Sequence, residues 1–397
     1  MSEKKGFPRK PVVLIICNYY LPGFKRGGGL RTIVNMVERF KDRFDFRIIT
    51  RDHDGDKISY DSINIDDWNE VQGAQVFYLP QNKVTLSKLR ELVLEVEPDT
   101  IYLNSVFSTL TIFLLTLRKL KLIPKVNIII APEGELSDGA LQLKAGKKKA
   151  FIKFAKITGL YRNIIWKTTA KLEEQETRRF EERGGRFFVA PNIPSRQLLI
   201  NYEENIKREK KIGEIKMIFL SRFMRKKNFK WLVENLENIQ GNLTIDIIGP
   251  IEDEDYWKET EPLLVNLPSN IKVEYKGLLE YEKVMPKLAE YHFFILPTLG
   301  ENFGHVFIEA LAAGCPLIIS DRTPWLDLDE KQIGWDIPLE NPVKWQEIIN
   351  FCINLDELSY SKLSDNSRKF ALQWLENPEI EEDTLTVLQN SLKAALN

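Results

Sequence analysis

Residues 293–316, FFILPTLGENFGHVFIEALAAGCP, place a strand, a turn and a helix in immediate succession. The apolar run Phe293–Leu296 has the length of a buried strand, Pro297 and Gly300 interrupt it, and residues 306–313 have the length of a helix. The backbone N–H groups of residues 302–306 open that helix without partners inside it, and such groups favour an anion or a sugar hydroxyl. The stretch predicts a ligand-binding loop in an α/β domain.

Strand-like and helix-like segments alternate in the same way along the rest of the chain, which predicts parallel sheets covered by helices on both faces. The alternation breaks at residues 191–194, PNIP, and at the polar residues 201–213, and a new strand starts at Lys216. We therefore expect two Rossmann-like domains facing each other across a cleft, with the boundary near residue 192. The predicted strands are residues 12–17, 46–50, 74–79, 100–103, 126–131, 164–167, 187–189, 216–220, 243–248, 271–276, 293–296 and 317–320.

The composition is that of a soluble globular protein of two domains: 397 residues, of which 43% are hydrophobic and 28% charged. There is no run of about 20 apolar residues that would span a membrane. The N-terminus, MSEKKGFPRK, lacks the pattern of a signal peptide. Three cysteines, Cys17, Cys315 and Cys352, lie in apolar segments, which indicates reduced core residues and predicts a cytoplasmic protein.

Charge is distributed unevenly, although the net charge is −1. Residues 1–192 hold 33 Lys and Arg against 23 Asp and Glu, an excess of ten positive charges, and the remaining 23 against 34 give an excess of eleven negative charges. This asymmetry indicates that the first half faces an anionic partner. Nucleic acid is disfavoured because the chain has no zinc-finger pattern or RNP-like strand, so a membrane surface or a phosphorylated acceptor is expected.

Glu301 and Glu309 are the acidic residues of the opening stretch. In isolation, such a pair is more often a helix cap and a solvated residue on a helix face. Glu309, however, lies in residues 306–313, which are otherwise apolar, and an ionised carboxylate in that setting needs partners. The pair therefore indicates a binding site.

The stretch from Glu301 to Pro316 resembles the signature of the retaining glycosyltransferases of family 4, which have the two-domain GT-B fold. The signature is a Glu, seven residues, a second Glu and then a Gly-x-Pro turn. The resemblance implies that Glu309 binds the ribose of the donor nucleotide and that Glu301 lies against the transferred sugar. It also implies that the donor is held by the backbone amides of the residues that follow the first Glu, namely Asn302, Phe303, Gly304 and His305, although His305 is equally expected as a structural residue.

The GT-B resemblance also sets the expected domains. In that fold the last helix crosses back to the first domain, and a helix break at Asn377 and Pro378 suits such a crossing. We therefore expect an N-terminal acceptor-binding domain of residues 1–192 plus about 378–397. Residues 193–377 are expected to form the donor-binding domain.

Arg222 and Lys227 follow the first strand of the second domain, in LSRFMRKKN. An Arg fork and a Lys point charge on one strand-to-helix loop suit a diphosphate, and positive charge there stabilises a leaving nucleoside diphosphate. Taken alone, such a run is more often a basic surface loop. The resemblance implies that Arg222 and Lys227 hold the donor diphosphate and that Arg225 and Lys226 are only neighbours.

Three glycines follow the first strand, in the stretch YYLPGFKRGGGLR that ends at Arg31. Glycines before a helix allow the backbone to approach phosphate closely, although a simple turn is the alternative. In the family, the matching loop reaches the donor phosphate and the acceptor. The resemblance therefore implicates Gly27 and Gly28, with Arg31 as a further candidate.

Further matches assign the remaining residues. By resemblance, Gly249 and Leu278 line the nucleobase pocket, and Glu133 and Gly134 belong to an acceptor-side loop in which an Arg is common at the position of Glu133. Asn104 stands where many members carry a His close to the reacting sugar. An Asn side chain hydrogen-bonds a hydroxyl but cannot titrate, so Asn104 is no general base.

The resemblance implies a hexosyltransferase that moves a sugar, with retention, from a UDP- or GDP-sugar to a saccharide or lipid-linked saccharide in polysaccharide or glycolipid synthesis. No cofactor or metal is expected, because the three histidines are scattered and Arg222 and Lys227 neutralise the diphosphate. A phosphorylase is disfavoured because no pyridoxal-binding lysine is identified. A non-catalytic GT-B subunit that binds sugar nucleotide or a partner protein is the alternative, and Asn104 favours it.

Residues 144–167, from Lys144 to Lys167, hold eight Lys or Arg and no acidic residue, interleaved with apolar residues. A basic amphipathic helix of this kind binds anionic lipid, which would place the protein at the inner face of the membrane. The alternative is a helix packed on its own domain with a solvated basic face.

Overall fold

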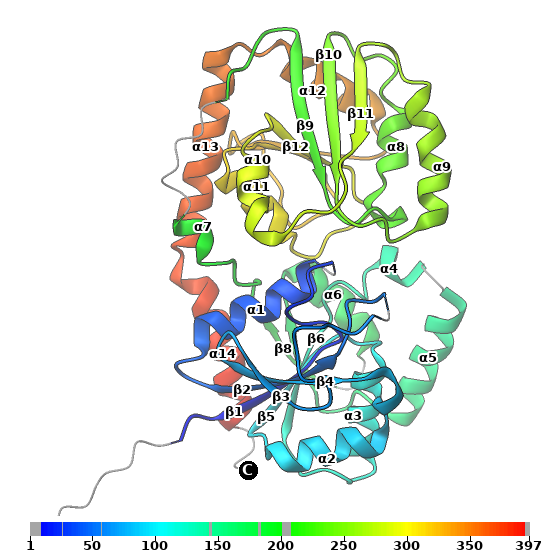
Figure 1. Cartoon of the computed structure of the whole chain (residues 1–397), viewed down its shortest axis with the longest axis vertical. Coiled ribbons are helices and arrows are strands. Elements are labelled where there is room, and N and C mark those ends of the chain that lie inside the picture. The colour runs from blue at the N-terminus through cyan, green and yellow to red at the C-terminus, as the bar shows by residue number, and fades with distance from the viewer. Residues whose placement is uncertain are drawn as a thin grey trace, which may run out of the picture. The chain divides into compact units, whose positions relative to one another are not determined.

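The computed structural model describes residues 9–25, 27–56, 58–142, 145–181, 184–200 and 208–393. The chain divides into two compact units, one of Met1–Ile193 together with Ile380–Asn397 and one of Pro194–Glu379. Each unit is a sheet with helices packed against it (Figure 1). Within the described part of the chain, no helix is both long and apolar enough to cross a lipid bilayer.

The sheet of the first unit has the strand order β3-β4-β2-β1-β5-β6-β7-β8. Every pairing is parallel except β3 with β4, which is antiparallel. The order reverses between β1 and β5, the topological switch point at which doubly wound folds bind ligands. The strands are β1 Val12–Ile16, β2 Asp45–Arg51, β3 Trp68–Val71, β4 Ala74–Leu79, β5 Thr100–Asn104, β6 Asn127–Ala131, β7 Ile165–Thr168 and β8 Arg186–Val189.

Helices cover both faces of this sheet. Successive residues of its central strands point to opposite faces and are therefore all buried. In β1, Leu14 and Ile16 pack with residues of α2 and α3, while Val13 and Ile15 are also fully buried on the other side. The C-terminal helix α14 belongs to this unit from Ile380 on, and its Glu381 pairs with Arg39 of α1. The helices are α1 Gly28–Phe40, α2 Leu86–Val96, α3 Thr109–Lys119, α4 Asp138–Gln142, α5 Ala145–Thr158, α6 Lys171–Phe180 and α14 Pro378–Lys393.

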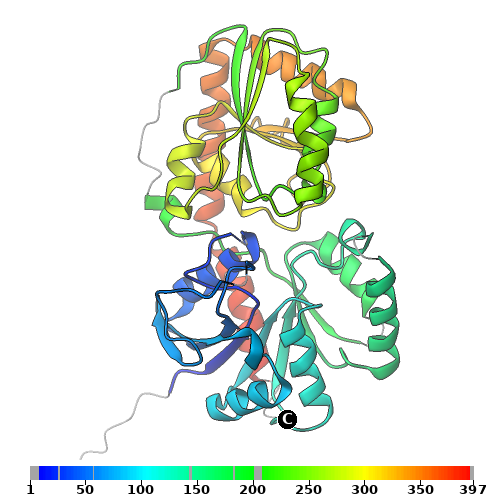
Figure 2. The same ribbon diagram turned by 45° about the vertical axis from the view of Figure 1, so that its right-hand side comes forward.

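The sheet of the second unit has the order β11-β10-β9-β12-β13-β14 with parallel pairings throughout. In chain order this is 3-2-1-4-5-6, the arrangement of a dinucleotide-binding domain, with the switch point between β9 and β12. Helices α8 and α9 lie on one side of it and α10 and α11 on the other (Figure 2). The strands are β9 Glu214–Leu220, β10 Asn242–Ile248, β11 Ile271–Tyr275, β12 Phe293–Leu296, β13 Leu317–Ser320 and β14 Gly334–Ile337.

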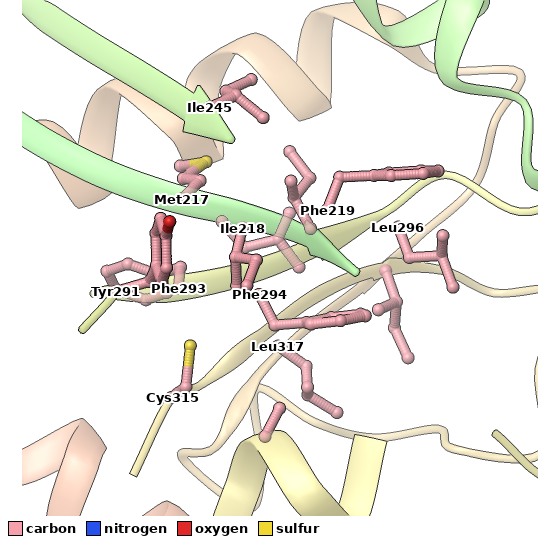
Figure 3. Close-up of a cluster of buried hydrophobic side chains, with 14 of the residues drawn as sticks. Met217, Ile218, Phe219, Ile245, Tyr291, Phe293, Phe294, Leu296, Cys315 and Leu317 are labelled. Atoms are coloured by element: carbon pink, nitrogen blue, oxygen red, sulfur yellow. The ribbon is translucent and has the colours of Figure 1, made fainter. Parts of the chain in front are cut away.

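The core of the second unit is built on the two strands at its switch point. Met217 and Phe219 of β9 and Phe293 of β12 are fully buried and are surrounded by residues of the neighbouring strands (Figure 3). Tight packing there fixes the strand ends from which the site loops leave. The helices of this unit are α7 Gln197–Ile200, α8 Phe229–Glu234, α9 Glu254–Val265, α10 Val284–Leu288, α11 His305–Ala312, α12 Pro342–Asn354 and α13 Glu357–Leu375.

Two strands were not predicted from the sequence. The edge strand β3 is only partly buried, so it lacks an apolar run, and it joins β4 through Gln72 and Gly73, both with positive φ. The strand β14 begins at Gly334, where a Cβ atom would lie 2.0 Å from the carbonyl oxygen of Leu317. Both strands form by pairing with a neighbouring strand, and the hydrophobic pattern of their own residues does not predict this pairing.

The basic segment 144–167 contains a helix only in its first part, and its end forms the strand that was expected at residues 164–167. Helix α5 covers only Ala145–Thr158, Lys144 lies outside the described residues, and the segment ends in the buried strand β7. Strand β7 is buried because it pairs with β6 on one side and β8 on the other. What remains for a surface role is α5, on which Phe154 and Ile157 are 58% and 71% exposed.

Candidate functional site

The loops that leave β9 and β12 carry the predicted diphosphate and sugar residues. Arg222 and Lys227 lie on the loop after β9, and Glu301 lies on the loop after β12. Because β9 and β12 are neighbours and parallel, their carboxyl ends meet at one edge of the sheet, at the switch point. The structure therefore places all three residues on two neighbouring loops at this sheet edge, although Arg222 and Glu301 are 79 positions apart in the sequence.

These two loops are tied to each other through the backbone. The carbonyl oxygen of Lys226 accepts hydrogen bonds from the Leu299 N–H (2.8 Å) and from the Thr298 hydroxyl (3.1 Å). The Glu301 N–H in turn donates to the carbonyl oxygen of Arg322, at 2.9 Å. The positions of Lys227 and Glu301 are thus set by main-chain contacts and not only by their side chains.

Glu301 and Lys227 form a largely buried ion pair. The Lys227 ammonium donates to Glu301 Oε2, the Asn302 N–H donates to Glu301 Oε1 at 3.0 Å, and the two charged side chains are 10% and 17% exposed, Lys227 first. Burial by itself would raise the pKa of Glu301, but the charges of Lys227 and Lys226 and these hydrogen bonds outweigh it and hold the pKa at about 2. Glu301 is therefore a carboxylate at any physiological pH.

Arg222 is paired with a carboxylate that the sequence did not single out. Its Nη1 lies 2.6 Å from Oε2 of Glu252, which belongs to the loop after β10. Neighbouring Arg225 pairs instead with Glu259 and Asp253. The only sequence signal for Glu252 is the acidic run 252–255 after the strand, and such runs are usually solvated.

Helix α11 begins at His305, one residue before the predicted start at residue 306. Gly304 is the N-cap residue with a φ of 75°, and a Cβ atom there would lie 2.6 Å from the Phe307 ring, so only glycine fits. Phe303 is held by its carbonyl oxygen, which accepts from Trp325 Nε1 at 2.6 Å, and its ring contacts that of His305. Glu309 lies inside α11 and is only 7% exposed, as its apolar surroundings in the sequence suggested.

Gly249 and Leu278 lie at the ends of β10 and β11. A Cβ atom on Gly249 would lie 2.1 Å from the carbonyl oxygen of Ser221, so the loops after β9 and β10 touch through this glycine. Its N–H donates to the Gly277 carbonyl oxygen at 2.9 Å, and Leu278 is exposed. The two residues thus occupy adjoining loops at the same sheet edge as Arg222.

In the first unit, the glycine-rich turn and Asn104 meet at the switch point. Helix α1 begins at Gly28, Gly27 has a φ of 60°, and a Cβ atom on Gly27 would meet nothing within 4 Å. Asn104, at the end of β5, donates from Nδ2 to the Gly29 carbonyl oxygen at 2.9 Å, while its Oδ1 is buried without a hydrogen-bond partner among the described residues. The side chain therefore supports the turn.

Glu133 and Gly134 belong to a buried polar network that the sequence did not predict. The Gly134 N–H donates to Glu173 Oε1 at 2.7 Å, Asn192 Nδ2 donates to Glu133 Oε2 at 3.2 Å, and the Lys167 ammonium donates to Asn192 Oδ1. Burial raises the pKa of Glu133 to about 7, the charge of Lys167 opposes the rise, and that of Glu173 adds to it. Spacing alone does not reveal this network, because its members lie within or after three different strands.

Part of the chain matches a known protein family. Residues 201–370 match the family model described as glycosyl transferases group 1. All of the matched residues belong to the second unit. Glu301, Glu309, Arg222 and Lys227 all lie within the matched residues.

A curated relative matches over a similar length. An uncharacterized glycosyltransferase of Methanocaldococcus jannaschii is 25% identical over 151 residues, which are 36% of this chain and 38% of that protein. The alignment thus spans well under half of the length of that relative.

Solved structures match nearly the whole chain in fold. Sucrose-phosphate synthase of Thermosynechococcus elongatus superposes with a TM-score of 0.71 at 18% identity, covering 97% of this chain and 100% of that one. HepE of Anabaena, in complex with UDP and glucose, gives 0.66 at 14% identity over 96% and 100%. WaaG, a glycosyltransferase involved in lipopolysaccharide biosynthesis, gives 0.67 at 12% over 93% and 98%. The expected α/β GT-B fold is confirmed.

Proposed function

We propose that this chain transfers a sugar from a UDP- or GDP-sugar to a saccharide or lipid-linked saccharide, with retention of the anomeric configuration. The observation that carries the proposal is the arrangement of Arg222, Lys227 and Glu301 at the switch point of a group 1 glycosyl transferase domain. The fold relative HepE is in complex with UDP and glucose, which supports a uridine nucleotide as the first donor to test.

In this proposal the group 1 domain binds the donor. Arg222 and Lys227 hold the diphosphate, and the N–H groups of residues 303–305, which lead into α11, hold sugar hydroxyls or phosphate, while the N–H of Asn302 orients the Glu301 carboxylate. Glu309 binds the ribose. Glu301 accepts hydrogen bonds from hydroxyls of the transferred sugar, because a carboxylate with a pKa of about 2 is ionised and has no proton to donate. Gly249 and Leu278 line the base.

The reaction then needs little acid–base chemistry from side chains. The bond between the anomeric carbon and the donor phosphate breaks, the acceptor oxygen bonds to the same face of that carbon, and the acceptor proton passes to the leaving phosphate. Negative charge grows on the diphosphate, where Arg222 and Lys227 stabilise it in place of a metal ion. In the described residues, no three His, Cys, Asp or Glu side chains cluster as metal ligands do.

The first unit takes the acceptor in this proposal, through the loops that carry Gly27, Gly28, Asn104, Glu133 and Gly134. Lys153 and Lys156 of α5, together with the exposed Phe154 and Ile157, suit a contact with anionic lipid. Such a contact would place the protein at the inner face of the cytoplasmic membrane, where a lipid-linked acceptor is found.

A thermal-shift screen with UDP, GDP, ADP and their sugars, without metal and then with Mg²⁺, tests the donor site. A ligand at 100 times its Kd stabilises the protein by about 2.7 kcal/mol, which is readily measured. We expect a shift with one nucleotide that Mg²⁺ does not change and that Arg222→Ala and Glu309→Ala reduce. No shift with any nucleotide would contradict the proposal.

Transfer itself is tested with the donor that binds. We expect Glu301→Gln to lower kcat by about a hundredfold, because the interaction strengthens in the transition state. Retention is read from the anomer of the product by NMR. A protein that binds the nucleotide but neither hydrolyses nor transfers the sugar would be the non-catalytic subunit that Asn104 favours.

A further inference from the structure

The ion pair between Arg222 and Glu252 is held in place by the backbone around it. The Phe223 N–H donates to the Pro250 carbonyl oxygen at 2.8 Å, and the Phe223 carbonyl oxygen accepts from the Glu252 N–H at 3.1 Å. Phe223 is fully buried against Phe219, Phe229, Tyr256 and Trp257. The backbone segments that carry Arg222 and Glu252 therefore cannot separate without disturbing the core around Phe223.

Gly249 strengthens this coupling of the two loops. The space in which its Cβ would lie is filled by the Ser221 carbonyl oxygen, so the loop of Glu252 and the loop of Arg222 are in direct contact. An exposed ion pair between two independent loops contributes little stability, because its formation costs the conformational entropy of both side chains. Here the backbone has already brought Glu252 to Arg222, so less side-chain ordering is lost when the 2.6 Å contact forms.

The two arginines of this loop differ in how many carboxylates they contact. Arg225 is paired with two carboxylates, Asp253 and Glu259, and its guanidinium lies 5.2 Å from the Tyr256 ring centroid. Among the described residues, Arg222 pairs with one carboxylate, that of Glu252, and both of these side chains are about a third exposed, 34% and 30%. Arg222 is thus the arginine of this loop that can exchange a carboxylate for a phosphate.

We infer that Glu252 is a specificity-determining residue of the donor site, which competes with the diphosphate for Arg222 and weakens the hold on the product more than on the donor. This inference rests on the proposed function. A nucleoside diphosphate product carries one more negative charge than the sugar nucleotide from which it came, because its terminal phosphate is no longer esterified. A fixed carboxylate at the diphosphate site therefore repels the product more strongly than the donor.

Loss of the Glu252 charge is expected to raise the affinity for both nucleotides. Removing the charge of Glu252 frees Arg222 for phosphate and removes the repulsion, so both ligands bind more tightly, and the product gains more. Since an ion pair of this exposure contributes at most about 1 kcal/mol, the expected change in affinity for the product is about two- to fivefold. The change for the donor is smaller.

The test is isothermal titration calorimetry of the full chain with UDP and with UDP-glucose, or with the guanosine equivalents if those bind. Glu252→Gln should lower the Kd for the nucleoside diphosphate about two- to fivefold, and raising the salt concentration should shrink the difference. Glu252→Asp keeps the charge and should stay near the wild type. Glu259→Gln, which removes one of the two carboxylate partners of Arg225, is the matched control and should leave both Kd values unchanged.

A second measurement shows that the effect passes through Arg222. In an Arg222→Ala background, Glu252→Gln should change the Kd much less than in the wild type, because the pair no longer exists. Product inhibition of transfer should be stronger in Glu252→Gln, with a lower inhibition constant.

The outcomes separate this inference from the proposed function. If the wild type binds no nucleotide, the proposed function fails and the inference fails with it. If the wild type binds and Arg222→Ala weakens binding, but Glu252→Gln binds equally or less tightly, the donor site stands and the role of Glu252 is overturned. An equal gain for donor and product would overturn the discrimination between them.

Discussion

Glu301 and Glu133 occupy comparable places in the two units and behave in opposite ways. Each lies on a loop after a central parallel strand, each carboxylate is buried, and each has a lysine nearby. Yet the pKa of Glu301 is held at about 2, whereas that of Glu133 is raised to about 7.

The difference lies in the neighbouring charges and the hydrogen bonds, and not in the burial. Both oxygens of Glu301 accept a hydrogen bond, one of them directly from the Lys227 ammonium, and Lys226 adds a second positive charge. Glu133 receives one bond, from the Asn192 amide, and its Oε1 is buried with no hydrogen-bond partner in the described ranges. The ammonium of Lys167 is bonded to Asn192 and reaches the carboxylate only through space, while Glu173 adds negative charge. Two positive charges and two accepted hydrogen bonds therefore lower the pKa of Glu301, whereas Glu133 has one lysine nearby, a second carboxylate and one hydrogen bond.

The largest effect is expected from breaking the pair in the second unit. Lys227→Met leaves the charge of Glu301 buried without its bonded partner and should destabilise this unit by about 3–5 kcal/mol. The midpoint of unfolding in urea, measured at pH 7, reports the loss. Because the pKa of Glu301 falls from 4.5 to about 2 on folding, the contribution of the pair is present above pH 4.5 and is lost as the pH falls toward 2.

The matched variant for this prediction is Lys227→Met combined with Glu301→Gln. It removes the buried charge as well, so it should recover part of the lost stability. A double variant no more stable than Lys227→Met alone would show that the two residues do not form one energetic unit.

A smaller effect, dependent on pH, is expected in the first unit. The folded state holds a proton on Glu133 up to a pH of about 7, whereas the unfolded chain releases it near 4.5, so this carboxyl costs stability as the pH rises between these values. Glu133→Gln removes that cost. The stability of the variant relative to the wild type should rise by about 1.4 kcal/mol per pH unit across this window. Thermal unfolding at a series of pH values between 5 and 8 measures it, and a difference that does not vary with pH would refute it.

The smallest effect concerns a neutral contact at the same sheet edge. Asn104→Ala removes the hydrogen bond to the Gly29 carbonyl oxygen and should destabilise the first unit by about 1 kcal/mol, with no dependence on pH because no charge is involved. The same pH series of thermal unfolding tests this prediction. A larger loss that varies with pH would place Asn104 in the network of Glu133, from which the structure separates it.

Much of the fold followed from the sequence, because apolar runs and helix-length segments alternate strongly enough to predict parallel sheets. Strands such as Phe293–Leu296 are buried on both faces and therefore read as continuous apolar runs. The burial of Glu309 could also be predicted, because the residues around it on the helix are apolar and leave it no solvated face. The edge strands β3 and β14 could not, because pairing with a neighbour, and not their own pattern, makes them strands.

The sequence by itself determined which residue types stand on the loops after each strand. Tertiary structure alone decided how those residues are paired: Lys227 with Glu301, Arg222 with Glu252, and Lys167 with Asn192 in place of Glu133. The physical reason is that parallel strands bring distant loops to one sheet edge, and the ionisation of each carboxylate there depends on the charges and hydrogen-bond donors that lie close to it. Neither sequence spacing nor net charge contains that information.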